Sequence, residues 1–200
     1  TIQYNIEIEG KNDPSKLPSE IDVLIALHQI LQSISRPTPP PVPYHTSIEK
    51  HLLFDQYSSS STMTTKVLRA AACHASPIFL SASKTTQKAT TLIQKATSNK
   101  ANLVIFPETY ISAFPIWSAI RAPTENHDHF KRMVDQSIYI DGPEIDTLRT
   151  TAQKCNTMIS IGISEKARCS SATLWNSNVL IGSNGDILNH HRKLQPTFFE

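Results

Sequence analysis

Apolar and polar positions follow a regular order from Lys66 onward. Apolar runs of strand length alternate with segments in which apolar residues recur every three or four positions. The predicted strands are Val67–Ala75, Asn102–Phe106, Met158–Ile163, Leu174–Ile181 and Ile187–His190. The predicted helices are Ser81–Ser98, Thr124–Ser137 and one that begins at Gly142-Pro143-Glu144. The order β-α-β-α-α-β-β-β predicts an α/β (α+β mixed) domain with a mixed sheet and helices outside it.

Residues 1–62 lack this order. Seven of the 13 prolines lie here, five of them in Pro37–Pro43, and the segment closes with Ser58–Thr62. Dense proline favours extended backbone and a serine run adds no core, so we expect a disordered leader or linker before a domain over residues 63–200. A short amphipathic helix over Pro18–Ser33 would have little to pack against. A proline-rich docking site for a partner is the alternative interpretation.

Glu108 lies at the end of the most strongly apolar strand. Leu103–Phe106 are four consecutive apolar residues, a pattern typical of a central strand buried on both faces. Pro107 ends that strand because it has no N–H to donate. Glu108 therefore follows the carboxyl end of a strand, where open α/β sheets place their chemistry. A solvated loop carboxylate, or the first residue of a helix, is the alternative.

Lys193 follows the last predicted strand. Asn184-Gly185 supplies the turn of a tight hairpin into Ile187–His190, and the basic stretch His190–Lys193 leaves that strand. A lysine at a strand end can be held against a carboxylate, where it stays protonated and offers a fixed positive charge to a developing oxyanion. A solvated basic turn is the alternative.

Charge and composition argue against several classes of partner. Lys and Arg number 19 against 17 Asp and Glu, and neither sign forms a long block, so nucleic acid and membrane surfaces are not expected partners. The longest apolar run is far too short to span a membrane, and no secretory signal is evident. Three cysteines without a C-x-x-C pair suit a reducing compartment, which predicts a soluble cytoplasmic protein. Because the chain starts at Thr1 and Glu200 follows an aromatic pair, we expect it to be part of a longer one.

The histidines do not have the spacing of a metal site. His127 and His129 point to different sides of a predicted helix, and the adjacent His190 and His191 face opposite ways on a strand. We therefore expect no bound metal.

Phe114 and Trp117 are candidate substrate-binding residues. Both follow Glu108 closely in the chain, and small-molecule pockets are mostly apolar. Packing in the core is the alternative for both residues, and it is the expected role of Trp175.

Five motifs resemble the nitrilase branch of the carbon–nitrogen hydrolase superfamily. They are FPET at 106–109, IDGPE at 140–144, GISE at 162–165, WNSN at 175–178 and NGDILNHHRKLQPTFFE at 184–200. The similarity runs without interruption from about Lys66 to Glu200, and the last motif is the most specific. The resemblance implies an α-β-β-α sandwich, incomplete here at its C-terminal side, and association into a homo-oligomer when the chain is complete.

The resemblance also implies the residues of the site. The family uses a cysteine nucleophile, two glutamates and a lysine. Glu108 matches the general base, Lys193 the catalytic lysine and Glu200 the second glutamate. No metal and no organic cofactor enter this chemistry, and the expected substrate is a small-molecule nitrile or amide.

The cysteine nucleophile is expected beyond residue 200. Cys73 lies in the first predicted strand, Cys155 on the inner face of a helix and Cys169 in a polar loop, whereas a reactive thiol needs an electropositive, partly exposed site. The chain thus resembles part of a nitrilase that converts a nitrile into carboxylic acid and ammonia, and we expect it to be inactive alone. The alternatives are an amidase or a nitrile or cyanide hydratase of the same superfamily, and a truncated product without catalysis.

Overall fold

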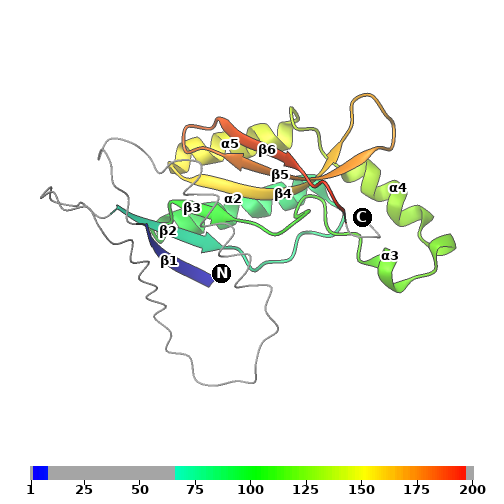
Figure 1. Cartoon of the computed structure of the whole chain (residues 1–200), viewed down its shortest axis with the longest axis horizontal. Helices are drawn as coiled ribbons and strands as arrows, with labels where there is room; N and C mark the ends of the chain where they lie inside the picture. Colours follow the sequence, from blue (N-terminus) through cyan, green and yellow to red (C-terminus); the bar gives the residue numbers. More distant parts are fainter. Residues whose placement is uncertain (1, 9–65, 197–200) are drawn as a thin grey trace, which may run out of the picture. The chain divides into compact units, whose positions relative to one another are not determined.

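A mixed sheet of six strands organises the part of the chain that the structure, a computed structural model, describes: residues 2–8 and 66–196. The strands are β1 (Ile2–Ile8), β2 (Lys66–Ala72), β3 (Leu103–Ile105), β4 (Met158–Lys166), β5 (Leu174–Ile181) and β6 (Ile187–Arg192). They lie in that same order across the sheet (Figure 1). β2, β3 and β4 are parallel, whereas β5 and β6 each run antiparallel to the preceding strand. The carboxyl ends of β3, β4 and β6 therefore lie at the same edge of the sheet.

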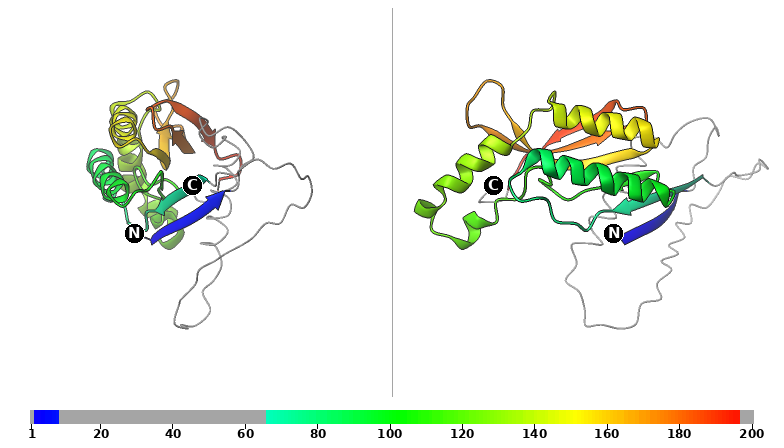
Figure 2. Two further views of the ribbon diagram at one scale, coloured as in Figure 1. Left: turned by 90° about the vertical axis from the view of Figure 1, so that its left-hand side faces the viewer. Right: turned by 180° about the vertical axis from the view of Figure 1, so that it is seen from behind.

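Two long helices, α2 (Ala82–Ser98) and α5 (Pro143–Cys155), cover one face of this sheet (Figure 2). The short helix α3 (Trp117–Ile120), the 3₁₀ turn η1 (Pro123–Glu125) and helix α4 (His127–Gln136) lie beyond the carboxyl ends of the parallel strands. Pro143 occupies the first turn of α5, where its missing N–H costs no helical hydrogen bond. None of the helices in residues 66–196 combines the length and apolar character that a bilayer-spanning segment requires.

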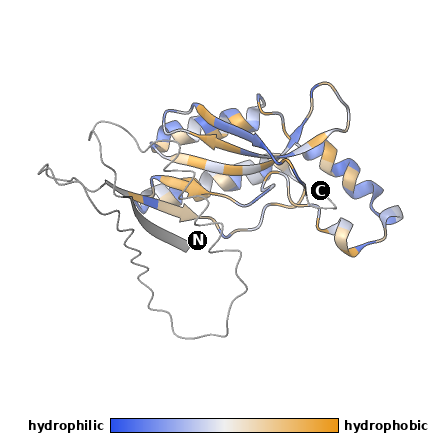
Figure 3. Ribbon diagram, in the orientation of Figure 1, coloured by the Kyte–Doolittle hydropathy of each residue, from blue (hydrophilic) through white to orange (hydrophobic). Residues whose placement is uncertain are grey.

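The hydrophobic core fills the space between these helices and the sheet. Ile93 of α2 and Leu148 of α5 are fully buried against Ile159, Ile161 and Ile163, which alternate along β4. Burying each such side chain contributes about 1.5–3 kcal/mol to folding. Figure 3 shows this contrast, with apolar colour along β3 and β4 and mostly hydrophilic colour on β6 and α4.

The middle of the opposite face of β4 and β5 carries small and polar residues, with Met158 and Leu180 toward one end and Leu174 at the other. Because side chains alternate between faces and the two strands are paired in register, these residues share one face. We call this the polar face; its residues are Ser160, Gly162, Ser164, Asn176 and Asn178. The helices therefore stabilise the sheet from one side and leave the polar face for other contacts.

The strands and helices predicted from Lys66 to Lys193 are confirmed, as is the mixed sheet with helices outside it. Several bounds differ. β2 ends at Ala72 and not at Ala75, whereas β4 and β6 continue to Lys166 and Arg192. The helix predicted from Thr124 begins at His127, because Pro123 opens a separate 3₁₀ turn. Ile2–Ile8 forms β1 within the expected leader, and its alternation of apolar and polar residues is typical of a strand.

The expected disordered leader falls mostly outside the described residues. Contacts divide the chain into two compact units, Thr1–Glu7 with Val67–Glu200 and Ile8–Lys66, and almost all described residues belong to the first. The helix expected over Pro18–Ser33 also lies outside the described residues. The leader over residues 1–62 and the domain boundary at 63 therefore stay predictions.

Candidate active site

Residues Pro107–Tyr110 leave the sheet as a bulge after β3. Phe106 N still donates to Ser160 O at 2.8 Å, as in a parallel ladder, and the ladder resumes where Ile111 N donates to Gly162 O at 3.2 Å. Pro107 interrupts it because proline has no N–H. The four residues between these bonds rise over β4 on the polar face and carry Glu108 toward β5.

Gly162 allows this bulge to lie against β4. A Cβ at position 162 would stand 2.5 Å from Pro107 O and from Thr109 N, and 2.7 Å from Glu108 Cα. Thr109 is held in the left-handed region with φ of 43°, where a β-branched residue is strained. Sequence reasoning missed this role of Gly162, although an isolated glycine in a strand signals close backbone approach.

Glu108 meets Lys193 and Asn176 above the polar face. Glu108 Oε1 accepts hydrogen bonds from Lys193 Nζ at 2.7 Å and from Asn176 Nδ2 at 2.6 Å. Lys193 N also donates to Asn176 O at 2.8 Å, which holds the chain just beyond β6 against β5. The side chains of Glu108 and Lys193 are 47% and 32% exposed, so a small molecule can reach this charged pair.

The structure thus brings together two of the three predicted catalytic residues from positions 85 apart in the sequence. Glu200 lies outside the described residues. Asn176 was not predicted, although it belongs to the WNSN motif, because a polar residue within a strand does not by itself indicate a role. Catalytic roles for Glu108, Lys193 and Glu200 stay predictions.

Trp117 packs in a small apolar cluster with Leu80, Ala113 and Met133 and is only 3% exposed. Its ring meets the Phe79 ring edge-on at 5.5 Å. Trp117 therefore packs in the core, which was the alternative to substrate binding that the sequence left open. Phe114 is half-buried. Substrate contact by Phe114 or Trp117 stays a prediction.

Cys155 and Cys169 lie on the elements predicted for them, whereas Cys73 lies just beyond the strand that was expected to contain it. Cys73 is buried just after β2, and burial raises the pKa of its thiol to about 11, so it is protonated at neutral pH and a poor nucleophile. Cys155 is half-buried against the core, and Cys169 is exposed in the loop between β4 and β5.

Within residues 66–196 no three His, Cys, Asp or Glu residues are grouped as a metal site would require.

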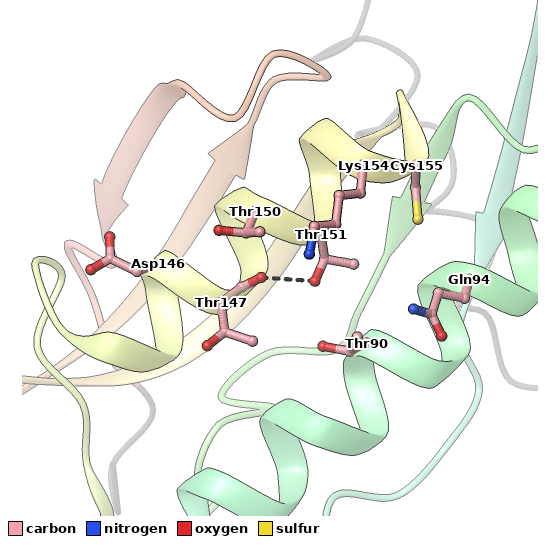
Figure 4. A pocket seen from close by; sticks show the side chains of 8 residues that line it. All are labelled: Thr90, Gln94, Asp146, Thr147, Thr150, Thr151, Lys154 and Cys155. Carbon is pink, nitrogen blue, oxygen red and sulfur yellow. Dashed lines mark hydrogen bonds between the residues drawn. The ribbon is translucent and has the colours of Figure 1, made fainter.

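A groove of about 400 Å³ lies between α2 and α5, on the outer side of the helical layer (Figure 4). Threonines dominate its lining: Thr90, Gln94, Asp146, Thr147, Thr150, Thr151, Lys154 and Cys155. Since the helices cover the face opposite Glu108, this groove is separate from the candidate site.

Glu165 forms a second charged cluster, on the helix-covered face of the sheet. Its side chain is only 1% exposed. Ser177 Oγ donates to its carboxylate at 2.5 Å, His190 Nε2 at 2.7 Å and Arg192 Nη2 at 2.7 Å. Arg192 also stacks over the Trp175 ring at 3.6 Å. The GISE motif contains Glu165, but nothing in the sequence alone indicated its partners.

We expect Glu165 to contribute to the acid sensitivity of the fold. Burial raises its pKa, but the bonds from Arg192, Ser177 and His190 outweigh that effect and hold the pKa below its ordinary value of 4.5. A carboxyl with a depressed pKa gives stability that is fully present above pH 4.5 and is lost as the pH falls through the folded-state pKa. Thermal unfolding between pH 7 and pH 3 should therefore show a smaller acid-induced drop in Tm for Glu165→Gln than for the wild type. An equal drop would contradict the assignment.

Most of the described chain is similar to known proteins of one family. Residues 69–200 match the carbon–nitrogen hydrolase family. The chain is 38% identical over 138 residues to an arylacetonitrilase of Hypocrea virens, covering 69% of this chain and 40% of that protein. It is 39% identical over 132 residues to a bromoxynil-specific nitrilase of Klebsiella pneumoniae subsp. ozaenae, covering 66% of this chain and 37% of that protein.

A crystal structure of an N-terminal amidase has a similar fold. It superimposes with a TM-score of 0.50 at 17% identity, covering 66% of this chain and 29% of that one. The likeness concerns the fold alone. The present chain thus spans well under half the length of each of these proteins.

Proposed function

This chain belongs to the carbon–nitrogen hydrolase family, in its nitrilase branch, and from that premise we propose that it carries part of the active site of a nitrilase. The reaction is hydrolysis of a small organic nitrile to a carboxylic acid and ammonia. The observation that supports this most is the Glu108–Lys193 pair at 2.7 Å, exposed above the polar face and joined by Asn176. We expect the complete protein to be a cytoplasmic homo-oligomer.

Glu108 is the general base in this proposal. It takes the proton of a cysteine thiol supplied from outside these 200 residues, and the thiolate forms a C–S bond with the nitrile carbon. Protonation of the nitrile nitrogen gives a thioimidate. Water activated by Glu108 adds to it and ammonia leaves, which gives a thioester; a second water then releases the acid and restores the thiol. Two waters are consumed for each ammonia released.

Lys193 stabilises the charge that develops during these steps. Its ammonium is held 2.7 Å from Glu108, so attack on a nitrile carbon beside Glu108 develops negative charge on the nitrile nitrogen close to Lys193. A positive charge fixed before the reaction needs no reorganisation in the transition state. Glu200 would hold Lys193 in place and share hydrogen bonds with Glu108 or the substrate.

The proposal predicts ammonia release by the longest natural chain that contains these residues. We expect aliphatic or aromatic nitriles to give acid and ammonia in equal amounts, measured by an ammonia assay and chromatography of the product. Residues 1–200 alone should release none, because they lack the nucleophile. Amide without ammonia would indicate a hydratase instead, turnover of amides but not nitriles an amidase, and no turnover of either substrate class would contradict catalysis.

A further inference from the structure

Two carboxylates stand back to back on opposite faces of the same pair of strands. Trp175, Asn176 and Ser177 alternate along β5, so Asn176 points to the polar face while its neighbours point to the other. Asn176 donates to Glu108, and Ser177 donates to Glu165. The same segment of β5 therefore binds Glu108, the candidate base, on the polar face and Glu165 on the opposite face.

At the end of β6, neighbouring residues likewise bind the two carboxylates on opposite faces of the sheet. Arg192 pairs in register with Ser177, and its guanidinium donates to Glu165 through Nη2 at 2.7 Å and Nε at 3.2 Å. Lys193 is the next residue and donates to Glu108 on the polar face. Since neighbouring residues of a strand point to opposite faces, fixing Arg192 also fixes the direction of Lys193.

Glu165 is built to hold this strand end firmly. It is 1% exposed and receives bonds from both β5 and β6, whereas Arg192 is 45% exposed and stacks on Trp175. Charge-assisted bonds to a buried carboxylate are stronger than neutral ones, and a two-pronged guanidinium contact adds geometric restraint. Replacing the carboxylate with an amide removes the negative charge and one acceptor oxygen, so its donors compete for the oxygen that remains.

We propose that Glu165 is a positioning residue that acts through Arg192 to aim Lys193 at Glu108. This inference rests on the proposed function. The candidate site would then depend on a carboxylate on the far side of the sheet that touches neither the substrate nor the reacting atoms.

The test is Glu165→Gln in the longest natural chain, assayed for nitrile turnover. Misplacement of a catalytic group by about 1 Å can cost about 100-fold, so we expect kcat to fall by about 10- to 100-fold while KM changes less than about threefold. Glu125→Gln is the matched control, because it removes an acid–arginine contact at the surface, 3.7 Å from Arg121. The control should keep wild-type kcat. Wild-type kcat in Glu165→Gln would overturn the proposal.

A second readout separates positioning from general loss of structure. In a crystal structure of Glu165→Gln, we expect Lys193 Nζ to lie beyond about 3.5 Å from Glu108. A fall in kcat with the 2.7 Å contact retained would overturn the proposal. If Glu165→Gln does not fold, Arg192→Lys serves instead: it keeps the charge but loses the two-pronged contact, and it should also lower kcat. Wild-type kcat in that variant would overturn the proposal.

Failure of the proposed function would give a different pattern. If Lys193→Ala keeps wild-type turnover, the assigned role of Lys193 is wrong whatever Glu165 does. The crystallographic distance in Glu165→Gln then still decides whether Glu165 aims the lysine.

Discussion

Replacing Lys193 with alanine should lower nitrile turnover about 1,000-fold or more in the longest natural chain that contains it. The ammonium is the charge placed to stabilise negative charge on the nitrile nitrogen, and loss of one such group costs about 100- to 1,000-fold. The substitution also removes the ion pair that orients the Glu108 carboxylate. A base that has lost its orienting partner adds to the loss.

The fold should tolerate this change. Lys193 is 32% exposed, follows β6 and lies outside the hydrophobic core, and exposed ion pairs contribute only about 0–1 kcal/mol. Lys95→Ala, at an exposed position near the end of α2, is the matched control for loss of a lysine charge. Steady-state kinetics and thermal unfolding of both variants check the prediction. Near-normal turnover in Lys193→Ala would remove that residue from the site.

Replacing Gly162 with alanine should damage both the candidate site and the fold. The added methyl would stand 2.5 Å from two backbone atoms of the Pro107–Tyr110 bulge, and backbone cannot swing aside as a side chain can. Overpacking of this kind costs about 1–3 kcal/mol of stability. Because the bulge carries Glu108, its displacement should also lower kcat by about 100-fold.

Gly182→Ala provides the matched control. A methyl there would stand 2.8 Å from Asn184 Oδ1 and 3.2 Å from the Leu188 side chain, both of which can move. We therefore expect little change in kcat and a smaller loss of Tm than for Gly162→Ala. Equal effects of the two variants on kcat would contradict a specific contact between Gly162 and the Glu108 bulge.

Local pattern in the sequence was enough for most of the fold. The apolar run Leu103–Phe106 and the proline that follows it located β3 and its end, and the Asn184-Gly185 turn located the β5–β6 hairpin. These features were predictable because strand period and turn chemistry depend on neighbouring residues. β1 was missed although Ile2–Ile8 alternates apolar and polar residues, because the proline-rich composition of residues 1–62 predicted a disordered leader. Its place at the sheet edge was not predictable, since it depends on pairing with a strand far along the chain.

The sequence predicted single residues of the candidate site but not the contacts between them. Glu108 and Lys193 were each noted at a strand end, and the motifs resembling nitrilases gave them roles. Gly162, Asn176 and Glu165 received no role, although each lies in one of those motifs. Their partners lie on other strands, so only pairing and register reveal what each side chain meets.

By itself, the sequence determined the kinds of elements, their order and the family, because these depend on local period and on motifs read along the chain. Only the tertiary structure decided that a bulge over Gly162 brings Glu108 to Lys193, and that Glu165 holds the same strands from the other face. The physical reason is that strand register and the alternation of side chains between two faces bring together residues far apart in the chain.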